Sequence, residues 1–117
     1  MSTLRLSLVQ SDTRWHDARA NRELYGHEVR RAAGQTDVVI LPETFLSGFS
    51  NDAAALAEGM NGESMRWLSG LAAETGVVIC GSLVLQDEHA RAVNRFVWMP
   101  PGGELVWYDK RHLFRMA

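Results

Sequence analysis

The sequence predicts an α/β fold in which a mixed sheet carries two helices on one face. Two successive passages run from a helix through a glycine into a short apolar strand, which is the order found in β-α-β units. A hairpin near the end of the sequence adds antiparallel strands. The composition suits one globular domain, because 46% of the 117 residues are hydrophobic and 22% are charged.

The first passage starts with residues 4–10, in which apolar and polar side chains alternate with the period of a half-buried strand. Residues 16–34 predict a helix, because small and apolar side chains recur near one face and Gly34 suits the end. The run 38–41 is apolar and β-branched, which is typical of a strand covered on both faces. This passage therefore predicts strand, helix and strand.

The second passage repeats the pattern and continues into a hairpin. Residues 63–76 predict a helix, and residues 77–85 predict another buried strand. Residues 93–110 predict two strands joined by a turn at Pro100 to Gly103. In the first arm Asn94, Phe96 and Trp98 alternate with the other residues and so share one face.

Two buried strands and only two covering helices imply an unfinished sheet. No linker, repeat or low-complexity tract divides the sequence, so residues 1–117 form a single unit. Strands that are apolar on both faces need cover on both faces. We therefore expect residues 1–117 to be part of a larger fold.

Charge and cysteine usage exclude several classes of function. The net charge of -2 gives no reason to expect nucleic acid or a membrane as partner. The four histidines have no metal-ligand spacing, so a zinc site is not expected, and no glycine-rich phosphate loop follows a strand. A single cysteine, Cys80, rules out an internal disulfide and predicts a reducing, cytoplasmic location.

Glu43 is the first candidate for chemistry, because it directly follows a predicted buried strand. The carboxyl ends of strands in an α/β sheet open onto the crevice where ligands bind. With Phe45 and Phe49 around it, we expect its pKa to be raised toward the range of a useful general base. Taken by itself, a solvated loop glutamate remains the more common alternative.

Lys110 is the second candidate, at the end of the last predicted strand. Its ammonium group could meet a developing oxyanion, whereas the alternative is a surface lysine paired with Asp109. Both Lys110 and Glu43 follow the carboxyl end of a strand, so we expect them to face one crevice. Cys80, by contrast, falls in the middle of an apolar strand and is predicted to be a core residue rather than a nucleophile.

Three blocks of the sequence resemble a known family. They are "VVILPETFLSGF", "GVVICGSL" and "NRFVWMPPGGELVWYDKRHLF", in this order. Together they resemble the N-terminal part of the carbon-nitrogen hydrolase family, or nitrilase superfamily, and within it the omega-amidase-like branch. The resemblance implies a four-layer αββα sandwich, a Glu-Lys-Cys triad and assembly into homodimers or larger homo-oligomers.

The resemblance also implies roles for the two candidates. Glu43 matches the general base, and Lys110 matches the lysine that stabilises the tetrahedral intermediate. The implied reaction is hydrolysis of a small amide through a cysteine thioester, with a short dicarboxylic or keto-acid monoamide as substrate and no metal or organic cofactor. Cys80 does not match the nucleophile, which we expect beyond residue 117.

Other interpretations stay open at this stage. The chain could be a degenerate half of such an enzyme rather than a fragment of an active one. It could also be a non-catalytic α/β regulatory or assembly module that retains the family surface, or a doubly wound domain that binds a small ligand.

Overall fold

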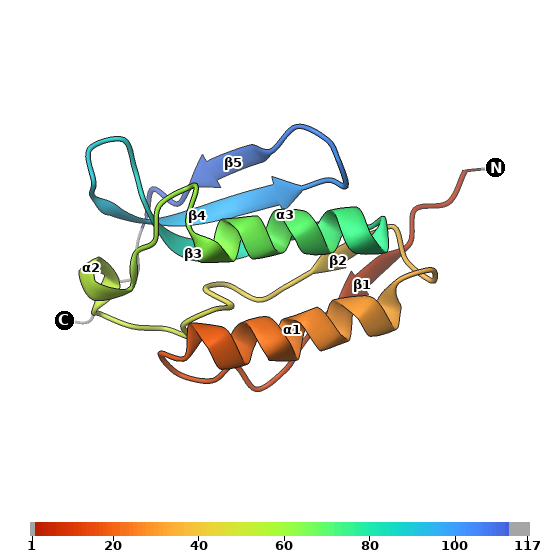
Figure 1. Ribbon diagram of the computed structural model, residues 1–117, viewed down its shortest axis with the longest axis horizontal. Helices are drawn as coiled ribbons and strands as arrows, with labels where there is room; N and C mark the ends of the chain where they lie inside the picture. Colours follow the sequence, from red (N-terminus) through yellow and green to blue (C-terminus); the bar gives the residue numbers. More distant parts are fainter. Residues whose placement is uncertain (1, 113–117) are drawn as a thin grey trace.

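The described part of the chain folds into a five-stranded mixed sheet with its two long helices packed on one face (Figure 1). The computed structural model describes residues 2–112. The elements in chain order are β1 (Leu6–Leu8), α1 (Ala18–Ala32), β2 (Val38–Ile40), α2 (Ala53–Leu56), α3 (Glu63–Thr75), β3 (Val78–Gln86), β4 (Ala92–Met99) and β5 (Val106–Asp109). The α/β class and the mixed sheet predicted from the sequence are therefore confirmed.

The strands lie in the sheet in the same order as in the chain, β1-β2-β3-β4-β5. The first three strands pair in parallel, whereas β4 pairs antiparallel with both β3 and β5. The predicted hairpin is thus formed by β4 and β5. Because two reversals restore the original direction, β5 points the same way as β2, and both strands end at the same edge of the sheet.

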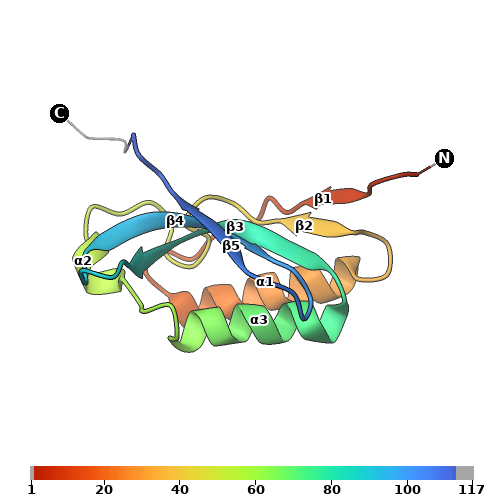
Figure 2. The ribbon, with the colours of Figure 1, turned by 90° about the horizontal axis from the view of Figure 1, so that it is seen from above.

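Helices α1 and α3 lie side by side on one side of the sheet (Figure 2). Helix α1 begins where the side chain of Asp17 accepts a hydrogen bond from the Ala20 backbone, as an N-cap should. Helix α3 ends at Gly76, whose φ of 72° is the left-handed conformation common at helix ends. The short helix α2 contacts β3 and β4.

The core lies between these two helices and the sheet. Its largest fully buried side chains come from both helices, from three strands and from the segment after β2; they are Tyr25, Val29, Val39, Phe45, Leu68, Ile79, Leu83, Leu85 and Val97. This arrangement follows from the helical spacing of apolar residues in α1 and α3 and from the alternation in β3 and β4.

The opposite face of the sheet is apolar and largely open to solvent, although Cys80 near its middle is buried by its neighbours. The strand register places Leu8, Ile40, Cys80, Trp98 and Val106 in one row across all five strands. Leu8 is 78% exposed and Val106 is 60% exposed. Large exposed apolar patches mark interaction surfaces or ligand-binding grooves rather than ordinary solvated surface.

The first strand shows the alternation that the sequence predicts, with an unexpected orientation. Leu6 and Leu8 lie on the open face, whereas Ser7 between them is half-buried toward the helices.

No helix in the described residues is both long and apolar enough to cross a membrane.

Candidate active site

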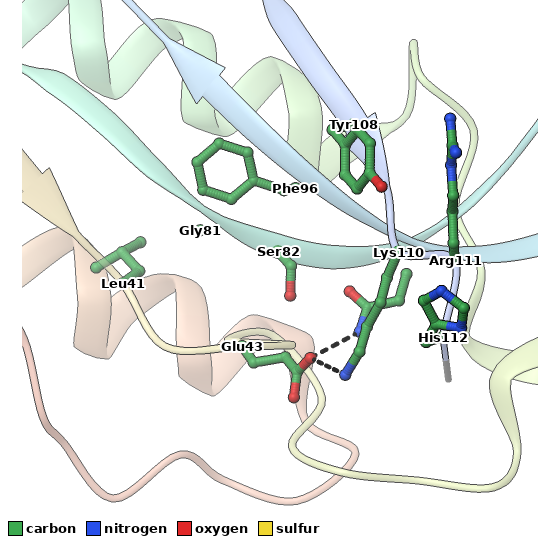
Figure 3. Close-up of a pocket in the computed structure, with 10 residues that line it drawn as sticks. Leu41, Glu43, Gly81, Ser82, Phe96, Tyr108, Lys110, Arg111 and His112 are labelled. Carbon is green, nitrogen blue, oxygen red and sulfur yellow. Dashed lines mark hydrogen bonds and ion pairs between the residues drawn. The ribbon is translucent and has the colours of Figure 1, made fainter. Parts of the chain in front are cut away.

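Glu43 and Lys110 meet at the edge of the sheet where β2 and β5 end. The Lys110 ammonium donates a hydrogen bond to Glu43 Oε2 at 2.8 Å, although the two residues are 67 positions apart (Figure 3). The expectation that both face one crevice is confirmed. The alternative pairing of Lys110 with Asp109 is wrong, because Asp109 binds Arg95 instead.

The backbone around Glu43 is held by β3. The Leu41 amide donates to the Cys80 carbonyl at 2.8 Å, and the Thr44 amide donates to Ser82 Oγ at 2.8 Å. Thr44 has a φ of 48°, a left-handed conformation that is costly for a β-branched residue and clusters at functional sites. The bonds to β3 stabilise this bend, which aims the Glu43 side chain away from the core.

The loop that follows Glu43 is anchored by the segment before α1. The Trp15 indole donates to the Phe49 carbonyl at 3.0 Å, and the His16 amide donates to the Ser47 carbonyl at 2.8 Å. The His16 ring also hydrogen-bonds the Ser50 hydroxyl at 2.6 Å. Three contacts therefore fix the path of this loop beside the glutamate.

Lys110 is fixed through its neighbour Asp109. Arg95 binds the Asp109 carboxylate in a bidentate manner, at 2.6 and 2.9 Å, and is itself 3% exposed. The Arg95 guanidinium also lies 3.8 Å from the centre of the Trp107 ring. Strand β5 has only four residues, so this pair holds a short strand whose end carries the lysine.

Removing the charge of Asp109 should destabilise the fold. Asp109→Asn leaves the buried Arg95 without its charged partner, and we expect a loss of about 3 kcal/mol in the free energy of unfolding. Urea unfolding of the full-length protein measures it. The control is Glu74→Gln, which makes the same change in the exposed Arg30–Glu74 pair and should cost clearly less. Equal losses in the two variants would contradict the structural role given to Arg95 and Asp109.

The pKa of Glu43 is lowered, so the predicted rise is wrong. The hydrogen bond from Lys110 is the largest cause, and it outweighs the partial burial of the carboxyl group. Phe45 does not surround the carboxylate, because it is fully buried against Tyr25 in the helix-side core. Phe49 is 54% exposed. Glu43 is therefore ionised at neutral pH, and its contribution to stability is lost only as the pH falls through this lowered pKa.

Two cavities flank the Glu43–Lys110 pair. The sheet-side cavity has a volume of about 480 Å³ and lies over the open face, where Ser82, Phe96 and Tyr108 line it (Figure 3). The loop-side cavity has a volume of about 530 Å³ and lies under Phe49 and Asn51. Glu43 and Lys110 line both cavities, so a small molecule in either one would contact both groups.

Sequence reasoning missed the role of Asn94 in this site. Its side-chain amide donates to Glu43 Oε2 at 3.1 Å, and it lines both cavities. The alternation of β4 already placed Asn94 on the same face as Phe96 and Trp98. That signal locates the side chain on the open face, but nothing in the local sequence shows that Glu43 is within reach.

Cys80 is a buried residue in the middle of β3, as predicted. It is 4% exposed, and burial raises the pKa of its thiol. A thiol of this kind stays protonated at neutral pH and reacts poorly. No group of three or more histidine, cysteine or carboxylate side chains that could hold a metal occurs among residues 2–112.

Cys80 should therefore react slowly with a thiol reagent in the folded protein and quickly in denaturant. In the full-length protein, mass spectrometry of the peptide that contains Cys80 follows its labelling separately from that of other cysteines. Fast, stoichiometric labelling of Cys80 at neutral pH in the folded state would reverse its assignment as a core residue.

The fold and the sequence place the chain in a known class of enzymes. A model of the carbon-nitrogen hydrolase family matches residues 5–117, and the chain belongs to this family. A CN-hydrolase superfamily protein from Xanthomonas campestris, crystallised with an arsenic adduct in its active site, is 53% identical and superposes with a TM-score of 0.91. The match covers 97% of this chain and 43% of that protein.

Several curated relatives are named omega-amidases. Omega-amidase YafV of Escherichia coli K12 is 39% identical over 117 residues, and that of Yersinia enterocolitica is 43% identical over 119 residues. Each match covers 100% of this chain and 44% of the relative, so the chain spans less than half of their length. Saccharomyces cerevisiae Nit3, a nitrilase superfamily member, is 26% identical with a TM-score of 0.83.

Proposed function

We propose that the chain is the N-terminal portion of an amidase that hydrolyses a small amide, with a short dicarboxylic or keto-acid monoamide as substrate. The contact between Glu43 and Lys110 at the mouth of two cavities carries this proposal. The omega-amidase relatives support the substrate class, since they cover the whole of this chain.

In the proposed reaction Glu43 moves protons and Lys110 stabilises negative charge. A cysteine supplied from beyond residue 117 loses its proton to Glu43 and attacks the amide carbonyl. The ammonium group of Lys110 donates to the oxyanion that forms. The proton held by Glu43 then passes to the leaving nitrogen, ammonia departs and a thioester remains.

The second half of the reaction reuses the same two groups. Glu43 takes a proton from water, which attacks the thioester, and Lys110 again donates to the oxyanion. Collapse of this intermediate releases the carboxylic acid and the cysteine thiolate, and the proton held by Glu43 passes to the thiolate, which restores the thiol and the ionised carboxylate. Each step needs a carboxylate that is ionised at the start, and the lowered pKa of Glu43 supplies one.

The rest of the polypeptide has a structural part in this proposal. We infer that it forms the second half of a four-layer αββα sandwich and covers the open face, where Leu8, Trp98 and Val106 are exposed. It would also bring the nucleophilic cysteine to the sheet-side cavity. A homodimer or larger homo-oligomer and a cytoplasmic location, in which the thiol stays reduced, complete the proposal.

Ammonia release by the full-length protein tests the proposed function. The substrates are a short dicarboxylic monoamide, its keto-acid counterpart and a matching amide that lacks the carboxylate. Faster turnover of the first two, with an acylated cysteine detected by mass spectrometry, would support the proposal. Ammonia release from none of the amides, without acylation, would instead favour a non-catalytic regulatory or assembly module.

A further inference from the structure

We propose that Asn94 is a positioning residue that holds Glu43 and Lys110 together and leaves Oε1 of Glu43 as the oxygen that carries the proton. This inference rests on the proposed function of the Glu43–Lys110 pair. It assigns Asn94 no contact with the substrate, and its effect on the reaction passes through the carboxylate.

Asn94 contacts both members of the pair. Its side-chain Nδ2 donates to Glu43 Oε2 at 3.1 Å, and its backbone carbonyl accepts a hydrogen bond from the Lys110 amide at 2.9 Å. One residue of β4 therefore binds the carboxylate through its side chain and the lysine through its backbone. Asn94 therefore helps to set the position of the two groups relative to each other.

The two oxygens of Glu43 are not equivalent. Asn94 Nδ2 and Lys110 Nζ both donate to Oε2, whereas no hydrogen bond among the described residues reaches Oε1. An ionised carboxylate oxygen without a donor has free lone pairs and can accept a proton. In this arrangement the hydrogen bonds to Oε2 hold the Glu43 side chain in place, and Oε1 remains available to accept the proton.

Asn94 adds something that Lys110 cannot provide. In the proposed reaction the Lys110 ammonium serves both Glu43 and the oxyanion, whereas the neutral amide of Asn94 donates to Oε2 of Glu43 alone. Tyr108, Arg111 and His112 are the other ionisable residues that line the sheet-side cavity, and the hydrogen bonds to Glu43 come from Asn94 and Lys110 rather than from these three. Asn94 itself is held in place because Arg95, the next residue, is locked to Asp109.

The test replaces Asn94 in the full-length protein. Asn94→Leu keeps a similar volume and removes the donor, and we expect kcat to fall about tenfold to a hundredfold while KM changes little. The hydrogen bond favours the charged form of Glu43, so its loss should also move the acidic limb of the kcat/KM profile to higher pH.

Two further variants make the result decisive. Asn94→Thr suits a strand, and its short hydroxyl does not reach Oε2, so it should behave like Asn94→Leu and serves if the leucine variant does not fold. Gln86→Leu makes the same change from amide to apolar side chain at the exposed end of β3, and it should leave both kcat and the acidic limb unchanged.

Normal kcat with an unmoved acidic limb in a folded Asn94 variant would overturn the inference while leaving the proposed function intact. A lower kcat with an unmoved limb would overturn it as well, because a general loss of structure reduces the active fraction without shifting the profile. No turnover in the unmodified protein would refute the proposed function, and this inference with it.

Discussion

Glu43→Gln in the full-length protein is expected to slow ammonia release by about a hundredfold to ten-thousandfold, the range typical of losing a general base. The amide keeps the size and shape of the carboxylate and can still accept a hydrogen bond from Lys110. It cannot take a proton from a thiol or from water at neutral pH. The loss should therefore appear in kcat much more than in KM.

Steady-state assays with a short dicarboxylic monoamide measure this loss, and circular dichroism checks that the variant is folded. Glu104→Gln is the matched control, because Glu104 is exposed in the connection between β4 and β5. It should retain normal turnover. Near-normal turnover by folded Glu43→Gln would remove Glu43 from the mechanism. The chain would then resemble the carbon-nitrogen hydrolases in its fold but not in this part of its chemistry.

Lys110→Met should slow the same reaction by about a hundredfold to a thousandfold, because the variant loses one donor to the oxyanion. The methionine keeps the unbranched stem and deletes the charge. The hydrogen bond from Lys110 is the largest cause of the lowered Glu43 pKa, so this pKa should rise in the variant. The acidic limb in the pH profile of the residual activity should therefore lie at a higher pH than in the unmodified protein.

The effects of the two substitutions on the rate should not multiply. Glu43 and Lys110 act in one transition state, so the double variant should lose much less than the product of the two single losses. Arg19→Met is the control for charge removal, because Arg19 is a largely exposed cation on α1. Unchanged rate and pH profile in folded Lys110→Met would exclude the lysine from the reaction.

Much of the fold could be predicted because local patterns determine it. The period of apolar residues gives α1, α3 and the strands, and Gly76 marks a helix end by its own conformation. The common location of Glu43 and Lys110 was predictable for a topological reason: both follow strands that point the same way and end at one edge.

The rest depends on contacts between residues far apart in the chain. The pKa of Glu43 was predicted in the wrong direction because Phe45, only two positions away in the sequence, turns into the core. The groups that lower the pKa, Lys110 and Asn94, lie 67 and 51 positions away. The Arg95–Asp109 pair was hidden for the same reason. Sequence proximity suggested the wrong neighbours for both carboxylates.

The order of the strands in the sheet has a consequence for biosynthesis. Because β1 to β5 lie in the order in which they are translated, each strand that leaves the ribosome finds the edge of the preceding strand available for pairing. The sheet can grow vectorially, without inserting a late strand between two early ones. The bond from Lys110 to Glu43 joins the segment after β5 to the segment after β2, so it can form only after β5 has emerged. A stalled nascent chain that lacks β5 can therefore form most of the sheet and core, but its Glu43 has no hydrogen bond from Lys110.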